Sequence, residues 1–155
     1  MAGPRRKRDA SRREVLAGGA GLAVALAIGP ARAEAEQTQA AIRAFTGEAE
    51  VRRGRVKLDI PVLVESGNSV PVSVSVDSPM TAADHVKRIA LFTEKNPLPD
   101  VARFHLGPRA GRAVVATRVR LADSQTVTAI AELSDGSFWS HTTDVIITLP
   151  ACAEG

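Results

Sequence analysis

One cysteine and three histidines are the first candidates in this sequence for a metal site or a covalent intermediate. They are Cys152, three residues before the end of the 155-residue sequence, and His85, His105 and His141. Two histidines and one cysteine form the ligand set of a mononuclear copper site. In that kind of site a ligand histidine and then a methionine follow the cysteine closely, whereas only Ala-Glu-Gly follows Cys152. The spacing argues against a metal site, and we expect no cofactor.

Other catalytic signatures are missing from the sequence. The Gly-x-Ser-x-Gly pattern of many serine hydrolases does not occur, and the serines of ESGNS (65–69) and SDGS (134–137) stand in ordinary turns. There is no glycine-rich phosphate-binding loop and no dinucleotide-binding fingerprint. The carboxylates are scattered without a defensible pairing. We therefore expect a protein that is not an enzyme.

Residues 1–33 have the pattern of an export signal. A charged stretch, RRKRDASRRE, precedes an apolar run, VLAGGAGLAVALAIG, and Ala-Arg-Ala before Glu34 fits a signal-peptidase site. Arg12 and Arg13 resemble the twin-arginine pair of the bacterial Tat pathway. The apolar run is too short and too rich in glycine for a comfortable membrane span. We expect Tat export to the periplasm without stable membrane insertion, and the alternatives are Sec export and a retained N-terminal anchor.

Removal of this segment changes the charge of the chain. The full sequence has 20 Lys/Arg and 17 Asp/Glu, and residues 1–33 hold seven of the former and two of the latter. The remaining 13 basic and 15 acidic residues give a net charge of about −2. Nucleic-acid binding needs a basic stripe. The longest basic run that remains is RRGR at residues 52–55, which we interpret as a solvated loop, so no nucleic acid is expected as a partner.

Cys152 is then the residue that needs an explanation. A single free cysteine is unusual in an exported protein, because oxidising compartments consume such thiols. The residue could be incidental, since chain ends tolerate change. Alternatively, it is a reactive thiol held away from the domain, because three residues beyond the last expected strand reach about 10 Å. On that interpretation the domain is a covalent carrier, and the chemistry belongs to the proteins that it visits.

The elements that must position this thiol are expected to be one helix followed by strands. Residues 34–50 are rich in helix formers, with an apolar stripe at Ala41, Ile42 and Phe45 and a stop at Gly47. Seven later segments have strand composition or alternation: residues 56–64, 70–76, 85–94, 102–107, 112–122, 125–134 and 138–149.

Turn signals and side-chain patterns refine this expectation. Pro61 interrupts the first strand, which predicts a kink or an edge position, and Asp-Gly within residues 134–137 predicts a hairpin. Residues 114–121 and 126–133 present Val and Ala on both faces, which fits central strands of one sheet, or strands covered by a partner. About seven strands separated by turns at intervals of about ten residues predict an all-β sandwich with an N-terminal helix.

Four short stretches are distinctive in combination. They are KLDIP (57–61), SVDSPM (75–80), EKNPLP (94–99) and LSDGSFW (133–139). Through these stretches, residues 42–149 resemble the SoxY family, the sulfur carriers of bacterial thiosulfate oxidation. The resemblance implies an immunoglobulin-like antiparallel sandwich, a periplasmic location and a stable heterodimer with a SoxZ-like β-sandwich subunit.

The resemblance also implies a reaction cycle on Cys152. A c-type cytochrome joins thiosulfate oxidatively to the thiol, a hydrolase removes the terminal sulfone as sulfate, and a sulfur dehydrogenase oxidises the remaining sulfane. The intermediates are carried as S-thiosulfonate and persulfide. The chain would then consist of a Tat-type signal (1–33), a SoxY-like sandwich with its helix (34–149) and a cysteine arm (150–155).

The arm departs from the family's Gly-Gly-Cys-Gly-Gly ending. Pro150 and Ala151 precede the cysteine, and Ala153 and Glu154 follow it. Glycine lacks a Cβ and is conformationally permissive, whereas proline fixes its own φ and restricts the residue before it. Two added methyl groups thicken the arm, and the carboxylate of Glu154 disfavours the thiolate that reacts.

Three hypotheses follow from these residues. The first is a working sulfur carrier with a variant arm. The second is a SoxY paralogue that acts as a binding or assembly subunit without carrying sulfur. The third is a sandwich that binds a small molecule or a metal, for which the histidines offer no ligand spacing.

Overall fold

A computed structural model describes residues 30–149 of the chain. The chain divides into two compact units after Ala33, and every strand belongs to the second unit. The elements follow one another as helix α2 (Pro30–Thr46) and strands β1 (Val51–Arg53), β2 (Val56–Asp59), β3 (Leu63–Ser66), β4 (Val70–Val76), β5 (Val86–Thr93), β6 (Asp100–His105), β7 (Val114–Val119), β8 (Gln125–Leu133) and β9 (Phe138–Leu149), with a short 3₁₀ turn, η2 (Pro108–Ala110), before β7.

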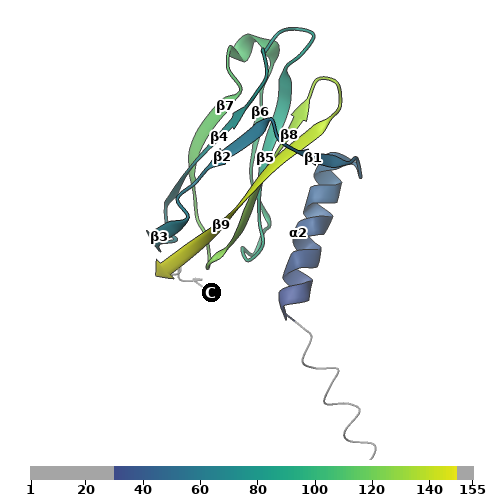
Figure 1. Ribbon diagram of the computed structural model, residues 1–155. Coiled ribbons are helices and arrows are strands. Elements are labelled where there is room, and N and C mark those ends of the chain that lie inside the picture. Colours follow the sequence, from purple (N-terminus) through teal and green to yellow (C-terminus); the bar gives the residue numbers. More distant parts are fainter. Residues whose placement is uncertain (1–29, 150–155) are drawn as a thin grey trace, which may run out of the picture. The chain divides into compact units, whose positions relative to one another are not determined.

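The strands form two sheets that face one another (Figure 1). The larger sheet has the order β1-β9-β8-β5-β6, and β3 also pairs with β9. The smaller sheet has the order β2-β4-β7. Every pairing is antiparallel except those of β1 and β3 with β9, which are parallel. The predicted immunoglobulin-like sandwich is confirmed, with nine strands in residues 30–149 where about seven were expected.

The core lies between the two sheets and is built by alternation. Val70, Val72, Val74 and Val76 of β4 are buried, while the intervening residues face outward, as the sequence predicts for residues 70–76. The predicted hairpin is also present, because β8 pairs with β9 around the turn at residues 134–137. Gly136 has a φ of 81° there, a conformation that glycine adopts without strain.

Two predictions near the start of the sandwich were wrong. The expected single strand 56–64 is two strands, because β2 pairs within the smaller sheet and β3 pairs with β9 of the larger one. The interruption predicted at Pro61 is confirmed, and β2 has the edge position that was its alternative. Pro61 lies between β2 and β3, where its missing N–H would break a continuous ladder. The expected loop at residues 52–55 is in part strand β1, which pairs with β9, and only Gly54 and Arg55 make a turn, both with positive φ.

A third prediction, that residues 114–121 and 126–133 are central strands of one sheet, was also wrong. β8 is central in the larger sheet, but β7 is an edge strand of the smaller one. Most of β7 is exposed or half-buried, whereas most of β8 is buried. The sequences of the two stretches do not distinguish an edge strand from a central one, because Val and Ala are accepted in both.

Helix α2 covers the outer face of the larger sheet. Phe45 is buried, and its ring packs edge-on against Phe92 at 5.8 Å and Phe138 at 5.9 Å. The hydroxyl of Thr38 donates to the Thr93 carbonyl at 3.1 Å. The helix ends as expected at Gly47, which has a φ of 62° and donates its N–H to the Arg43 carbonyl. Within residues 30–149, no helix has the length and apolar composition needed to span a membrane.

A buried carboxylate lies in β8 next to the hairpin turn that leads to β9. Glu132, only 6% exposed, accepts hydrogen bonds from Lys87 at 2.7 Å and from the guanidinium of Arg88. Burial favours its neutral form, but the two cationic donors outweigh burial and hold the pKa of Glu132 below its ordinary value. A lowered pKa means that this contribution to stability is present at neutral pH and is lost as the pH falls through the folded-state pKa.

We therefore expect Glu132→Gln to lower the free energy of unfolding at pH 7 by about 1–3 kcal/mol, the usual range for hydrogen bonds to charged groups. The difference from the wild-type protein should shrink as the pH falls through the folded-state pKa of Glu132, because the protonated carboxyl is then as uncharged as the amide of glutamine. Urea unfolding at pH 7 and at pH 3 measures both values. Equal unfolding free energies of the two proteins at pH 7 would show that the cluster contributes nothing net.

Candidate functional site

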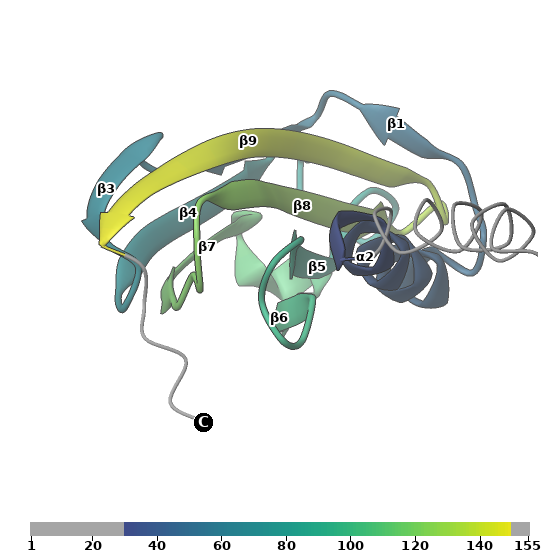
Figure 2. The ribbon, with the colours of Figure 1, turned by 90° about the horizontal axis from the view of Figure 1, so that it is seen from below.

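The end of β9, from which residues 150–155 continue, is fixed on the sandwich. β3 pairs with this part of β9, with Leu63 opposite Ile146 and Ser66 opposite Leu149 (Figure 2). The N–H of Gly67 donates to the Leu149 carbonyl at 3.1 Å, and the N–H of Ile146 donates to the Val62 carbonyl at 2.8 Å. The last described residue before the arm is therefore held by backbone hydrogen bonds.

Loops at the same end of the sandwich hold β3 and β9 in turn. The N–H of Leu121 donates to the Gly67 carbonyl at 2.8 Å, and the N–H of Ile147 donates to the Ser124 hydroxyl at 2.9 Å. Asn96 ties these loops together, because its side-chain oxygen accepts from Ala122 and its amide donates to the Arg120 carbonyl. The root of the arm thus rests on a connected hydrogen-bond network.

A persistent negative charge lies within this network. The backbone N–H of Ser124 donates to Asp123, and Lys95 lies 3.4 Å from the same carboxylate. The hydrogen bond from Ser124, followed by that from Lys95, holds the pKa of Asp123 below its ordinary value. Asp123 therefore stays ionised at any pH near neutrality.

The predicted site residues themselves lie outside the described part of the chain. These are the proposed carrier residue Cys152 and the signal residues Arg12 and Arg13. Cys152 follows Leu149 by three residues, so its sulfur can reach about 10 Å from the fixed root. A thiol on such a tether can enter another protein's active site but cannot travel along the sandwich.

The three histidines are not brought together. His141 Nδ1 accepts the N–H of Leu58 at 2.9 Å and so occupies an edge of β2. His85 Nδ1 lies 3.1 Å from the Thr81 carbonyl, and His105 is exposed at the end of β6. In residues 30–149, no three His, Cys, Asp or Glu side chains cluster closely enough to hold a metal ion.

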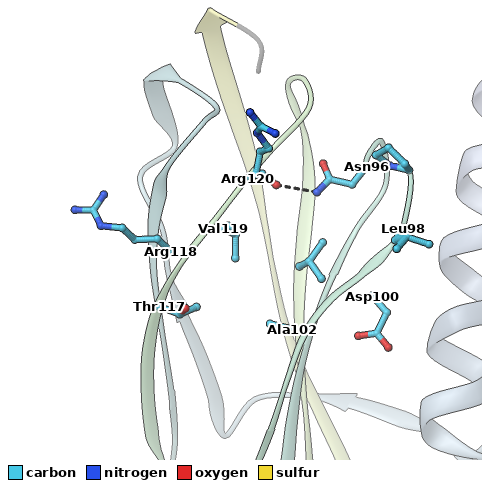
Figure 3. A pocket seen from close by; sticks show the side chains of 10 residues that line it. Asn96, Leu98, Asp100, Ala102, Thr117, Arg118, Val119 and Arg120 are labelled. Carbon is cyan, nitrogen blue, oxygen red and sulfur yellow. Dashed lines mark hydrogen bonds between the residues drawn. The ribbon is translucent and has the colours of Figure 1, made fainter. Parts of the chain in front are cut away.

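A groove of about 490 Å³ lies between the edges of β6 and β7 (Figure 3). Its charged side chains are already engaged: Arg118 donates to Ser69, Arg120 donates to Asn68, and Asp100 pairs with Arg103. The groove holds no pair of residues in the relation of nucleophile and base. Its geometry therefore offers no catalytic centre.

The sequence did not reveal a set of exposed apolar residues around the arm root. Val62, Leu63, Ile146 and Leu149, which we call the arm collar, are between 58% and 63% exposed. Val62 and Leu63 were expected inside a strand, and composition does not say which face of a strand meets solvent. The only available signal was the Ile-Ile pair of β9, which puts one isoleucine on each face of the strand.

Comparisons with known proteins identify the family of the chain. A family model described as "Sulfur oxidation protein SoxY" matches residues 42–152, a range that ends on the cysteine. The structure of the sulfur carrier protein SoxY from Chlorobium limicola f thiosulfatophilum is 26% identical, with a TM-score of 0.63 over 74% of this chain and 99% of that chain. No curated relative matches the chain by sequence.

Two superoxide reductases share the fold at lower identity. The neelaredoxin from Ignicoccus hospitalis is 22% identical, with a TM-score of 0.55 over 61% of this chain and 80% of that chain. The enzyme from Nanoarchaeum equitans is 12% identical, with a TM-score of 0.53 over 62% of this chain and 100% of that chain. At these identities the likeness concerns the sandwich alone.

Proposed function

Because the chain belongs to the SoxY family of sulfur oxidation proteins, we propose that it is a sulfur carrier that holds thiosulfate-derived intermediates covalently on Cys152. The observation that carries this proposal is the pinned end of β9. Leu149 is held by Gly67 and lies opposite Ser66 in the ladder, three residues before the only cysteine. A fixed root and a short tether deliver the thiol to a defined place outside the domain.

Two steps of the proposed cycle change the cargo on Cys152. In the first, the thiolate and thiosulfate form a sulfur–sulfur bond to give the S-thiosulfonate, and two electrons pass to a c-type cytochrome. In the second, water attacks the terminal sulfone, sulfate and two protons leave, and the persulfide stays on the cysteine. The carrier supplies only the sulfur nucleophile, so catalysis belongs to the enzymes that it visits. A sulfur dehydrogenase would oxidise the remaining sulfane.

The compartment of this cycle is proposed from the N-terminal sequence. Arg12 and Arg13 would direct the folded protein to Tat export, and cleavage after Ala33 would leave a periplasmic protein that begins at Glu34. The mass of the protein recovered from the periplasm tests this, because a retained signal adds 33 residues.

SoxZ is the expected partner of a SoxY protein. We propose a stable heterodimer with a SoxZ-like β-sandwich and transient contacts with the cytochrome and the sulfate-releasing hydrolase. The edges of two small sandwiches are surfaces that proteins commonly cover.

One observation favours a second function. The four residues around Cys152 are Pro150, Ala151, Ala153 and Glu154, where the resemblance implies glycine. A SoxY paralogue that no longer carries sulfur would keep the fold and the SoxZ-like partner but would not need a thin, glycine-flanked arm. The second candidate is therefore a non-carrier binding or assembly subunit.

A truncation separates the two candidates. A variant that ends at Leu149 should bind the SoxZ-like subunit with unchanged affinity, because the arm root is held within the sandwich. The same variant should release no sulfate in a thiosulfate-oxidation assay reconstituted from purified components. Calorimetric titration and sulfate analysis give the two readouts. Undiminished sulfate release would rule out the carrier and leave the assembly subunit.

A further inference from the structure

We propose that the arm collar is the surface on which the enzymes that process Cys152 dock. This inference rests on the proposed carrier function. The collar consists of Val62, Leu63, Ile146 and Leu149, and it lies at the end of the sandwich that leads into the arm, where β3 pairs with the end of β9. The occupant is an enzyme whose active-site entrance has apolar side chains on its rim, placed to meet Leu63 and Ile146.

The first argument is the reach of the thiol. Leu149 is fixed by its carbonyl, and three extended residues carry Cys152 at most about 10 Å away. An enzyme that takes the thiol into a recessed site must therefore bring the rim of that site close to Leu149. The nearest neighbours of Leu149 are Ser66 and Gly67, and the exposed pair of Leu63 and Ile146 lies three residues back along the same two strands, about 10 Å away. A rim that surrounds the entrance of the site therefore extends over this pair.

The second argument is where the apolar residues are placed. The described chain exposes six large hydrophobic side chains, and four of them form the collar. Scattered exposed hydrophobics are ordinary, whereas neighbouring ones mark an interaction site, and Leu63 and Ile146 are direct neighbours in the ladder. Along the outward-facing positions of β9, Thr142 and Asp144 precede Ile146, and Thr148 follows it. Ile146 is the apolar residue of this exposed face, and it lies opposite the exposed Leu63 of β3.

The chemistry of the collar fits a shared and transient contact. Apolar association is not directional, so one patch can meet the rims of several enzymes. Four side chains make a contact well below the size of a stable interface, so each visit can end quickly. Thiosulfate gains nothing from such a patch, so the collar binds protein while the arm carries the anion.

The test makes the collar polar without touching the thiol. The variant is Leu63→Thr with Ile146→Thr, both at exposed strand positions where threonine is well accepted. The control is Val114→Thr, which is 52% exposed on β7. Val114 lies five residues before Val119, about 16 Å along a strand whose other end leads to Leu121 and Gly67. Each is prepared as the heterodimer with the SoxZ-like subunit.

Chemical loading separates docking from the first enzymatic step. Tetrathionate converts the Cys152 thiolate into the S-thiosulfonate and releases thiosulfate, so no cytochrome is needed. The purified sulfate-releasing hydrolase is the probe, and sulfate release is followed against carrier concentration. We expect the double variant to raise KM about tenfold, which corresponds to about 1.4 kcal/mol. We expect Val114→Thr to stay within about twofold of wild type, as surface substitutions usually do.

Three results would overturn the proposal that the arm collar is a docking surface. One is a wild-type KM for the double variant. Another is a loss of affinity for the SoxZ-like subunit, which would assign the collar to the heterodimer interface. The third is a changed rate of Cys152 alkylation by iodoacetamide, which would mean that the arm itself packs on the collar. If the loaded wild-type protein gives no sulfate, the proposed carrier function fails first, and the collar proposal falls with it.

Discussion

Cys152→Ala is expected to reduce thiosulfate-dependent sulfate release to the level of an assay without the protein. A methyl group cannot form the sulfur–sulfur bond that holds the cargo, and the sequence contains no other cysteine. The loss should therefore be complete. The melting temperature should not change, because the hydrophobic core within residues 30–149, from Phe45 to Ile147, is built without residue 152.

Thermal unfolding, partner titration and sulfate analysis of the same preparation check this prediction together. Ser124→Ala is a useful contrast, because it removes the hydroxyl that holds Ile147 and should lower stability while leaving the thiol in place. An alanine variant at position 152 that supports full sulfate release would show that the protein does not carry sulfur on its thiol.

Restoring glycines around the thiol is expected to have the second largest effect. The quadruple variant changes Pro150, Ala151, Ala153 and Glu154 to glycine. With enzymes from a bacterium whose SoxY has the glycine-flanked arm, we expect kcat/KM for sulfate release to rise at least about tenfold. Forcing one extra methyl group into a fitted site commonly costs about 1–3 kcal/mol, and 1.4 kcal/mol is a factor of ten. Steady-state kinetics on the chemically loaded carrier give the ratio.

Glu154→Gln alone separates the charge of the arm from its shape. Charge in a solvated tail is strongly screened, so this variant should change kcat/KM by less than about threefold at physiological salt. If the quadruple variant and the wild-type protein react equally fast with the glycine-arm enzymes, the thickness of the arm does not limit transfer.

Local patterns predicted much of the fold. The alternation of Val70, Val72, Val74 and Val76 fixes which face of β4 is buried, and Asp-Gly in the turn at residues 134–137 fixes a hairpin. Gly47 ends the helix because it reaches a positive φ that other residues adopt with strain. Each of these features depends on residues that are close together in sequence.

The features that the sequence did not predict depend on distant pairings. β1 is three residues long and contains Arg52 and Arg53, so its local sequence does not favour a strand. It is a strand because it pairs with the edge of β9, about 90 residues later in the chain. The separation of β2 from β3 likewise depends on long-range pairing, because the two parts of residues 56–66 pair with different sheets. The edge position of β7 follows from topology, because Val and Ala on both faces suit an edge or a centre.

The candidate site divides in the same way. The type and position of Cys152 are read from the sequence, as is the departure of its neighbours from glycine. The support of the arm needs the structure, because Gly67, Asn96 and Ser124 come from three loops that only the fold brings together. The arm collar needs it too, since exposure is a property of the assembled sheets.

Intact mass is the measurement that tests the carrier on Cys152 most directly. The protein is purified without reductant from the periplasm of cells that are oxidising thiosulfate. We predict a chain that begins at Glu34 and carries additions of single sulfur atoms and of thiosulfate, all of which disappear on reduction. A uniform, unmodified mass from such cells would contradict the account, because a working carrier must be found loaded during turnover.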